Sequence, residues 1–92
     1  NLVDAILKCK KEGYWIVSAS VGEGSESITD FKFPEKTLLI MGSEGKGVQK
    51  SLEKHADFKV FIPMLGKIDS LNVSQATACF SYEFRKQYPG NE

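Results

Sequence analysis

The chain has 92 residues, which is enough for one small domain with a modest hydrophobic core. Twelve Lys and Arg residues balance twelve Asp and Glu residues, so the net charge at pH 7 is zero. This total gives no general attraction to nucleic acids, membranes or acidic ligands, although a local basic patch is compatible with it. No stretch is apolar for long enough to span a membrane and no signal-peptide pattern is present, so we expect a soluble protein without a membrane partner.

In chain order, the first predicted element is a short amphipathic helix in LVDAILKCKKEG, whose apolar residues recur every three or four positions until Gly13. Residues Tyr14–Ala19 (YWIVSA) form a continuous aromatic and β-branched run, which predicts a strand buried on both faces. The composition of residues 20–27 predicts a loop, and residues 28–33 a short extended piece. Thr37–Met41 (TLLIM) reads as a second buried strand.

The second half continues the alternation. Residues Val48–Ala56 have a helical pattern, Phe58–Met64 a strand pattern, and VSQATACFSYEFRKQ a long amphipathic helix. Asn72 precedes that helix as a candidate N-cap, and Gln75 stands where a capping box needs it. Continuous apolar strands that alternate with helices predict an α/β domain with a mainly parallel sheet and flanking helices.

The glycine-rich stretch MGSEGKGV (residues 41–48) resembles a phosphate-binding loop only superficially. A Walker A loop has four residues between its first glycine and its Gly-Lys pair, whereas only two separate Gly42 from the pair at 45–46. The loop GEGSES has Ser27 where a dinucleotide fingerprint needs its last glycine. His55 is the one histidine and has no partner ligand at metal spacing, so we predict no metal site.

Three segments nevertheless belong together: TLLIMGSEGKG, VFIPMLG and DSLNVSQA each end a predicted strand or begin a helix. In a parallel sheet these points meet at the carboxyl edge of the strands, where open α/β sheets bind ligands. Glycine backbone, apolar neighbours and the helix start at Asn72 suit a nucleoside-like small molecule. The alternative is that the glycines are structural turns and the aliphatic residues are ordinary core.

The same segments, in this order, closely resemble the second and third motifs of the SpoU/TrmH-type RNA 2′-O-ribose methyltransferases of the SPOUT superfamily. LLIMGSEGKGV resembles motif two, FIPMLGKIDSLNVSQATACFSYEFRKQ resembles motif three with its final helix, and NLVDAILKCKKEGYWIVSA resembles the preceding helix and strand. The resemblance covers residues 1–92 as the C-terminal portion of such a domain. It implies a SPOUT-type α/β fold with a C-terminal trefoil knot, an exception to the rule that chains are unknotted.

The resemblance also implies S-adenosyl-L-methionine as cofactor, RNA as substrate and a homodimer as the working unit. Carried over by position, the acid of motif two and the polar residue of motif three near the reacting groups are Glu44 and Asn72. The backbone contacts to the cofactor would come from Gly42, Ile62 and Leu71, and the residues that line or support the pocket would be Met64, Ser70, Asn72, Val73 and Ser74.

Motif one, with the family's Asn and catalytic Arg, has no counterpart in residues 1–92, and Arg85 in the last helix does not match that position. We therefore expect a truncated domain that is inactive alone, within a parent that methylates ribose 2′-hydroxyls. The segments SEGKG and SLNVS favour ribosomal over transfer RNA, in a bacterial cytoplasm or an organelle. Two alternatives stay open: a non-catalytic cofactor- or RNA-binding relative, and a general α/β interaction domain.

Overall fold

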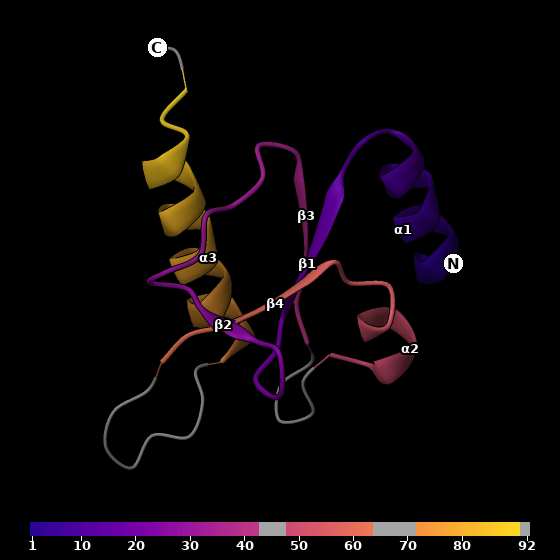
Figure 1. Ribbon diagram of the computed structural model, residues 1–92, viewed down its shortest axis with the longest axis horizontal. Coiled ribbons are helices and arrows are strands. Elements are labelled where there is room, and N and C mark those ends of the chain that lie inside the picture. The colour runs from indigo at the N-terminus through magenta and orange to yellow at the C-terminus, as the bar shows by residue number, and fades with distance from the viewer. Residues whose placement is uncertain (43–47, 64–71, 91–92) are drawn as a thin grey trace.

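The computed structural model describes residues 1–42, 48–63 and 72–90, and within them it forms one parallel sheet flanked by helices (Figure 1). The sheet has the strand order β2-β4-β1-β3, and each neighbouring pair is parallel. The elements in chain order are α1 (Leu2–Lys11), β1 (Trp15–Ala19), β2 (Glu26–Ser27), β3 (Thr37–Ile40), α2 (Lys50–Glu53), β4 (Phe58–Phe61) and α3 (Val73–Gln87). The predicted α/β class and parallel sheet are confirmed.

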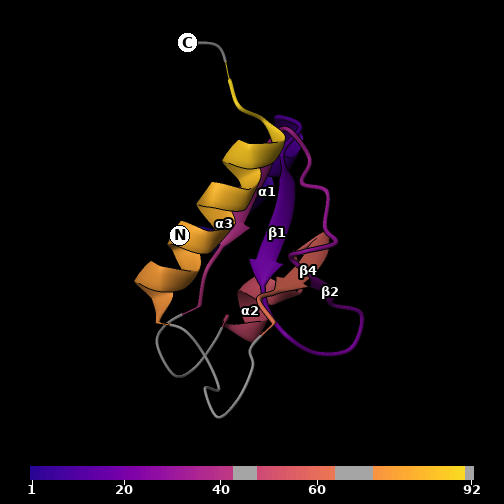
Figure 2. The same cartoon turned by 90° about the vertical axis from the view of Figure 1, so that its left-hand side faces the viewer.

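The sheet is the middle layer, with α3 on one face and α1 and α2 on the other (Figures 1 and 2). Alternation along the strands explains the two cores, because successive side chains point to opposite faces. Ile16 and Ile40 pack in the cluster on the α1 and α2 side. Val17 and Leu39 pack with Phe80 of α3 on the other side. Residues buried on both faces are typical of parallel strands, as the sequence predicted for β1.

Helix α1 begins and ends where its sequence predicts. The Asn1 side chain accepts a hydrogen bond from Asp4 N at 3.0 Å and caps the first turn. Gly13 has φ +91°, a left-handed conformation that suits glycine after a helix. No helix in the described part of the chain is long and apolar enough to cross a membrane.

Residues 20–27 are not wholly a loop, because Glu26–Ser27 form strand β2. Its partners are Val60 and Phe61 of β4, and Ile28 N extends the pairing by donating to Phe61 O at 2.8 Å. The polar composition of this segment does not predict a strand. The strand forms because its backbone groups pair with the edge of β4, and this pairing does not depend on the side chains.

The segment after β2 carries two buried rings, Phe31 and Phe33, but forms no strand. Among the residues that the structure describes, side chains at the end of α3, and no neighbouring strand, form hydrogen bonds with the backbone of Phe31 and Phe33. Gln87 binds the Phe31 carbonyl and the Phe33 amide, and the Tyr88 hydroxyl donates to the Phe33 carbonyl. The predicted extended piece at residues 28–33 is therefore wrong for its first half, because residues 28–30 form a turn that Asp30 N closes by donating to Ser27 O at 3.0 Å.

Two predicted elements are shorter in the structure by more than one residue. Helix α2 covers only Lys50–Glu53 of the predicted Val48–Ala56, because Gln49 is extended (φ −61°, ψ 139°) and Val48 is buried ahead of it. Strand β4 ends at Phe61, and Pro63 two residues later has no N–H for a ladder hydrogen bond.

Candidate cofactor site at the carboxyl edge of the sheet

The described ends of motifs two and three meet at the carboxyl edge of the sheet. Gly42 follows β3, and Ile62 follows β4. Helix α3 begins at the same edge and runs back along the sheet, as Figures 1 and 2 both show. The topology therefore gathers Gly42, Ile62 and Asn72 at the edge where open α/β sheets bind ligands.

Five of the nine predicted site residues are described, and they differ in exposure. Gly42, Ile62 and Val73 are half-buried, whereas Asn72 and Ser74 are exposed. The remaining four lie outside the described residues: Glu44, Met64, Ser70 and Leu71.

Ile62 belongs to the apolar floor of this edge. It packs with Met41 and Ala19 against the core cluster that contains Val17 and Val60. These three half-buried side chains follow or end neighbouring strands, so together they form an apolar surface under the carboxyl edge. Such a surface suits the flat, weakly polar face of a nucleoside base.

The start of α3 provides the polar part of the site. Asn72 Oδ1 accepts a hydrogen bond from Gln75 N at 2.8 Å, and Gln75 Oε1 accepts one from Asn72 N at 3.4 Å, which confirms the predicted capping box. This box fixes the Asn72 side chain and uses its carbonyl oxygen. The Nδ2 amide group is the donor with which Asn72 can bind a ligand, beside the partial positive charge of the helix N-terminus.

A polar network on the opposite face ties β1, β4 and α2 together near the same edge. Ser20 Oγ hydrogen-bonds Glu53 Oε2 at 2.9 Å and Ser18 Oγ at 3.2 Å. Lys59 Nζ lies 3.6 Å from Glu53 Oε1. Sequence reasoning missed this network, although a serine inside an apolar strand was a signal, since Ser18 is fully buried and a buried hydroxyl needs a partner.

A second feature, an apolar groove of about 380 Å³, lies between edge strand β3 and α3. It is not the predicted cofactor site, because Thr37 at the beginning of β3 lines it and the predicted site lies beyond the end of that strand. The residues that line the groove are Phe33, Thr37, Leu39, Phe80, Ser81, Phe84 and Arg85.

Comparison with known proteins identifies this arrangement. The family model described as "SpoU rRNA Methylase family" matches residues 1–82. The chain is 36% identical over 87 residues to the 23S rRNA (guanosine-2′-O-)-methyltransferase RlmB of Pseudomonas aeruginosa, covering 95% of this chain and 35% of that protein. It thus spans about a third of the length of this curated relative.

Two solved structures extend the comparison. The crystal structure of the A. aeolicus TrmH/SpoU tRNA modifying enzyme matches with a TM-score of 0.87 and 35% identity, covering 97% of this chain and 45% of that one. The SpoU methyltransferase AviRb from Streptomyces viridochromogenes, in complex with the cofactor AdoMet, matches with a TM-score of 0.77 and 28% identity, covering 99% of this chain and 35% of that one. The predicted resemblance is confirmed, and the chain belongs to the SpoU rRNA methylase family.

Proposed function

We propose that the protein is an S-adenosylmethionine-dependent RNA methyltransferase that modifies a ribose 2′-hydroxyl, and that residues 1–92 supply most of its cofactor site. The observation that carries this proposal is the meeting of Gly42, Ile62 and Asn72 at the carboxyl edge of the sheet. The similarity to the AdoMet complex of AviRb over 99% of this chain supports the choice of cofactor.

The described residues suit the parts of such a ligand. The apolar floor formed by Ala19, Met41 and Ile62 would contact the adenine face, and the half-buried Gly42 would bring its backbone close. The Nδ2 group of Asn72 and the start of α3 would orient polar atoms. We also propose that the same pocket includes Val73 and Ser74 of the first helical turn, together with Met64, Ser70 and Leu71.

When bound, S-adenosylmethionine supplies an electrophilic methyl group. A ribose hydroxyl is a weak acid, so the attack needs a group that accepts or stabilises its proton. Glu44 is our candidate for this work, with Asn72 as a nearby orienting donor. Holding the hydroxyl in line contributes on the order of 7–11 kcal/mol when the geometry is good.

We propose further that another segment of the protein completes the site and carries the catalytic arginine. Within the described ranges, β3 is an edge strand, although its sequence, TLLI, has the apolar character of an interior parallel strand. The apolar groove beside it gives an added strand a surface to cover. Arg85 lies about 20 Å along the helix axis from Asn72, too far to act there.

The remaining predictions stay proposals: a C-terminal trefoil knot, a homodimer, and a home in the bacterial cytoplasm or an organelle. Relatives include enzymes named for ribosomal RNA and for transfer RNA. We propose ribosomal RNA because the segments SEGKG and SLNVS look more like that branch.

The experiment that tests the function is methyl transfer by the full-length protein to ribosomal and transfer RNA, with the modified nucleoside identified by mass spectrometry. A 2′-O-methylated nucleoside is the expected product, and residues 1–92 alone should give none. Cofactor binding without methyl transfer by the full-length protein would favour the non-catalytic relative. If the full-length protein binds neither cofactor nor RNA, the result would favour the alternative of a general α/β interaction domain.

A further inference from the structure

The amino edge of the sheet, opposite the candidate cofactor site, carries an exposed aromatic ring at the start of a buried strand. Trp15 is 51% exposed, whereas the next residue, Ile16, is 0% exposed. Its backbone is fixed, because Trp15 N donates to Lys36 O at 2.9 Å. A large exposed aromatic side chain on a rigid strand is a feature that burial alone does not explain.

Neighbouring rings support the indole from one side. Its centroid lies 5.9 Å from that of Phe58, and Phe58 lies 5.4 Å from the buried Phe31. These contacts restrict the rotation of Trp15 and anchor it to the core, while half of its surface stays open. The result is a preformed stacking surface on sheet elements.

A hollow of about 260 Å³ lies at the same edge, and Trp15 is among the residues of its apolar and charged lining. Its residues are Lys10, Gly13, Tyr14, Trp15 and Asp57. Asp57 accepts a hydrogen bond from Ile16 N at 2.8 Å, and Lys10 Nζ lies 3.5 Å from its other oxygen. The carboxylate is therefore held in place and its charge is offset by Lys10, so it can accept an N–H from the edge of a base.

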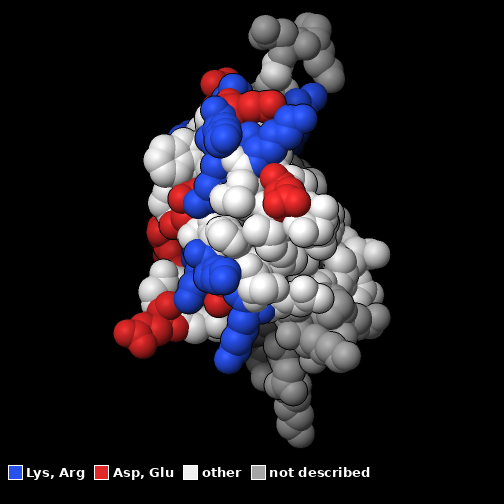
Figure 3. Space-filling model, turned by 90° about the vertical axis from the view of Figure 1, so that its right-hand side faces the viewer, with Lys and Arg blue, Asp and Glu red and all other residues white. Residues whose placement is uncertain are grey.

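Further lysines lie at this end of the molecule. The last turn of α1 contains Lys8, Lys10 and Lys11, and Figure 3 shows blue side chains at the end of the molecule where α1 ends, with red side chains among them and a second blue group further down. Lys36 Nζ lies 5.2 Å from the centre of the Tyr14 ring. Lysines at the same edge as exposed aromatic side chains are a combination with which proteins bind single-stranded nucleic acid, through phosphates and stacked bases.

We propose that this amino edge binds a single-stranded segment of RNA, with one base stacked on Trp15 and flanking phosphates against Lys11 and Lys36. The proposal rests on the proposed function for the identity of its partner and adds a second RNA contact to it. Strand β1 is about 16 Å long, so the edge would hold nucleotides distant from the one that is methylated.

The chain offers a direct probe, because Trp15 is its only tryptophan. Titration of the 92-residue chain with a short single-stranded RNA should quench the Trp15 emission in a saturable way, and added salt should reverse the quenching. Binding without a change in emission, detected by the anisotropy of labelled RNA, would place the RNA surface elsewhere and overturn the proposal. Absence of any binding would also overturn it.

Variants separate stacking from charge. Trp15→Ala should weaken RNA affinity roughly five- to hundredfold, while Trp15→Phe keeps most of the affinity. Tyr82→Ala is the matched control, because Tyr82 is a 71% exposed aromatic residue on α3, away from this edge. Lys11→Gln with Lys36→Gln should lower the salt dependence of binding. Equal affinities of Trp15→Ala and the unmodified chain would contradict the proposal.

The outcome is independent of the cofactor site when S-adenosylmethionine binding is measured alongside by calorimetry. Binding of S-adenosylmethionine without RNA quenching would reject this surface and leave the proposed function standing. RNA quenching without cofactor binding in the full-length protein would reject the methyltransferase proposal and keep the RNA surface.

Discussion

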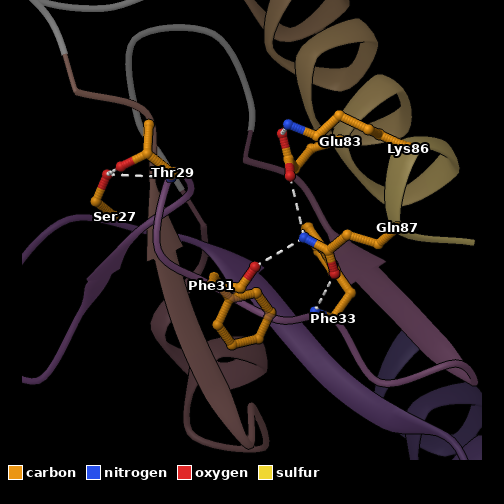
Figure 4. Close-up of polar contacts among 7 residues, drawn as sticks. All are labelled: Ser27, Thr29, Phe31, Phe33, Glu83, Lys86 and Gln87. Carbon is orange, nitrogen blue, oxygen red and sulfur yellow. Dashed lines mark hydrogen bonds and ion pairs between the residues drawn. The ribbon is translucent and has the colours of Figure 1, made fainter.

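Gln87 holds the backbone of Phe31 from across the chain: its Nε2 donates to the Phe31 carbonyl at 2.8 Å (Figure 4). Its Oε1 accepts from Phe33 N, also at 2.8 Å, so one amide satisfies two backbone groups of a segment that has no strand partner there. Helix α3 is thereby fixed to the core at the end opposite Asn72.

Gln87→Ala should lower the free energy of unfolding by about 1–3 kcal/mol, because it leaves two part-buried backbone groups without partners. Urea denaturation measures this loss. Gln49→Ala is the control, since the Gln49 side chain makes no capping hydrogen bond at the start of α2. Equal stability of the two variants would show that water replaces the Gln87 contacts at little cost.

Glu83 gives the protein a predictable response to acid. The hydrogen bond from Gln87, followed by contact with Lys86, lowers the pKa of the Glu83 carboxyl below its usual value (Figure 4). Because the pKa of Glu83 is lower in the folded state, its ionised carboxyl stabilises the fold, and this stabilisation is fully present above the unfolded pKa. It is lost as the pH falls through the folded pKa.

Glu83→Gln should therefore flatten part of the pH dependence of unfolding below about pH 5, the range in which the unfolded carboxyl takes up its proton before the folded one. Urea midpoints across this range provide the measurement. Gln87→Ala should shift the Glu83 pKa upward, which NMR titration of the carboxyl carbon detects. Identical slopes in the unmodified protein and Glu83→Gln would show that Glu83 contributes no linkage.

Asn72 combines a structural role with a proposed binding role, and two substitutions separate them. Asn72→Ala removes the cap and should cost about 0.5–2 kcal/mol of stability. Asn72→Ser keeps a capping oxygen but loses the Nδ2 donor, so it should preserve stability and weaken S-adenosylmethionine binding in the full-length protein. Unchanged cofactor affinity in Asn72→Ser would show that Asn72 acts as a helix cap and does not bind the cofactor through Nδ2.

Glu44→Gln in the full-length protein should lower the rate of methyl transfer by about 10²–10⁴-fold, the range that a general acid or base contributes. Cofactor affinity should change little, because the substitution conserves size. Glu35→Gln is the control, since Glu35 is exposed before β3, at the opposite edge of the sheet. Full activity of Glu44→Gln would remove this acid from the site.

The features predictable from sequence are those set by nearby residues. The pair Asn72 and Gln75 predicted the capping box, and the mostly apolar runs predicted the parallel strands β1 and β3. Strand β2 was not predictable, because backbone pairing with β4 creates it in a polar segment.

The contacts of Gln87 and Ser18 were equally hidden. Gln87 and Phe31 are 56 residues apart in the sequence, and glutamine near a helix end ordinarily faces solvent. Ser18 stood out as a polar residue in a buried strand, yet nothing local connects it through Ser20 to Glu53 of α2. The roles of the predicted cofactor residues stay predictions, because they depend on a bound ligand.

The most direct test of the proposed function is calorimetric titration of S-adenosylmethionine and its demethylated product into the full-length protein, with Leu71→Arg as the blocked-pocket control. We expect saturable binding of both ligands and loss of both in Leu71→Arg, with the fold unchanged by circular dichroism. Parallel titration of residues 1–92 would show how much of the pocket this chain supplies. A folded full-length protein that binds neither ligand would contradict the cofactor assignment.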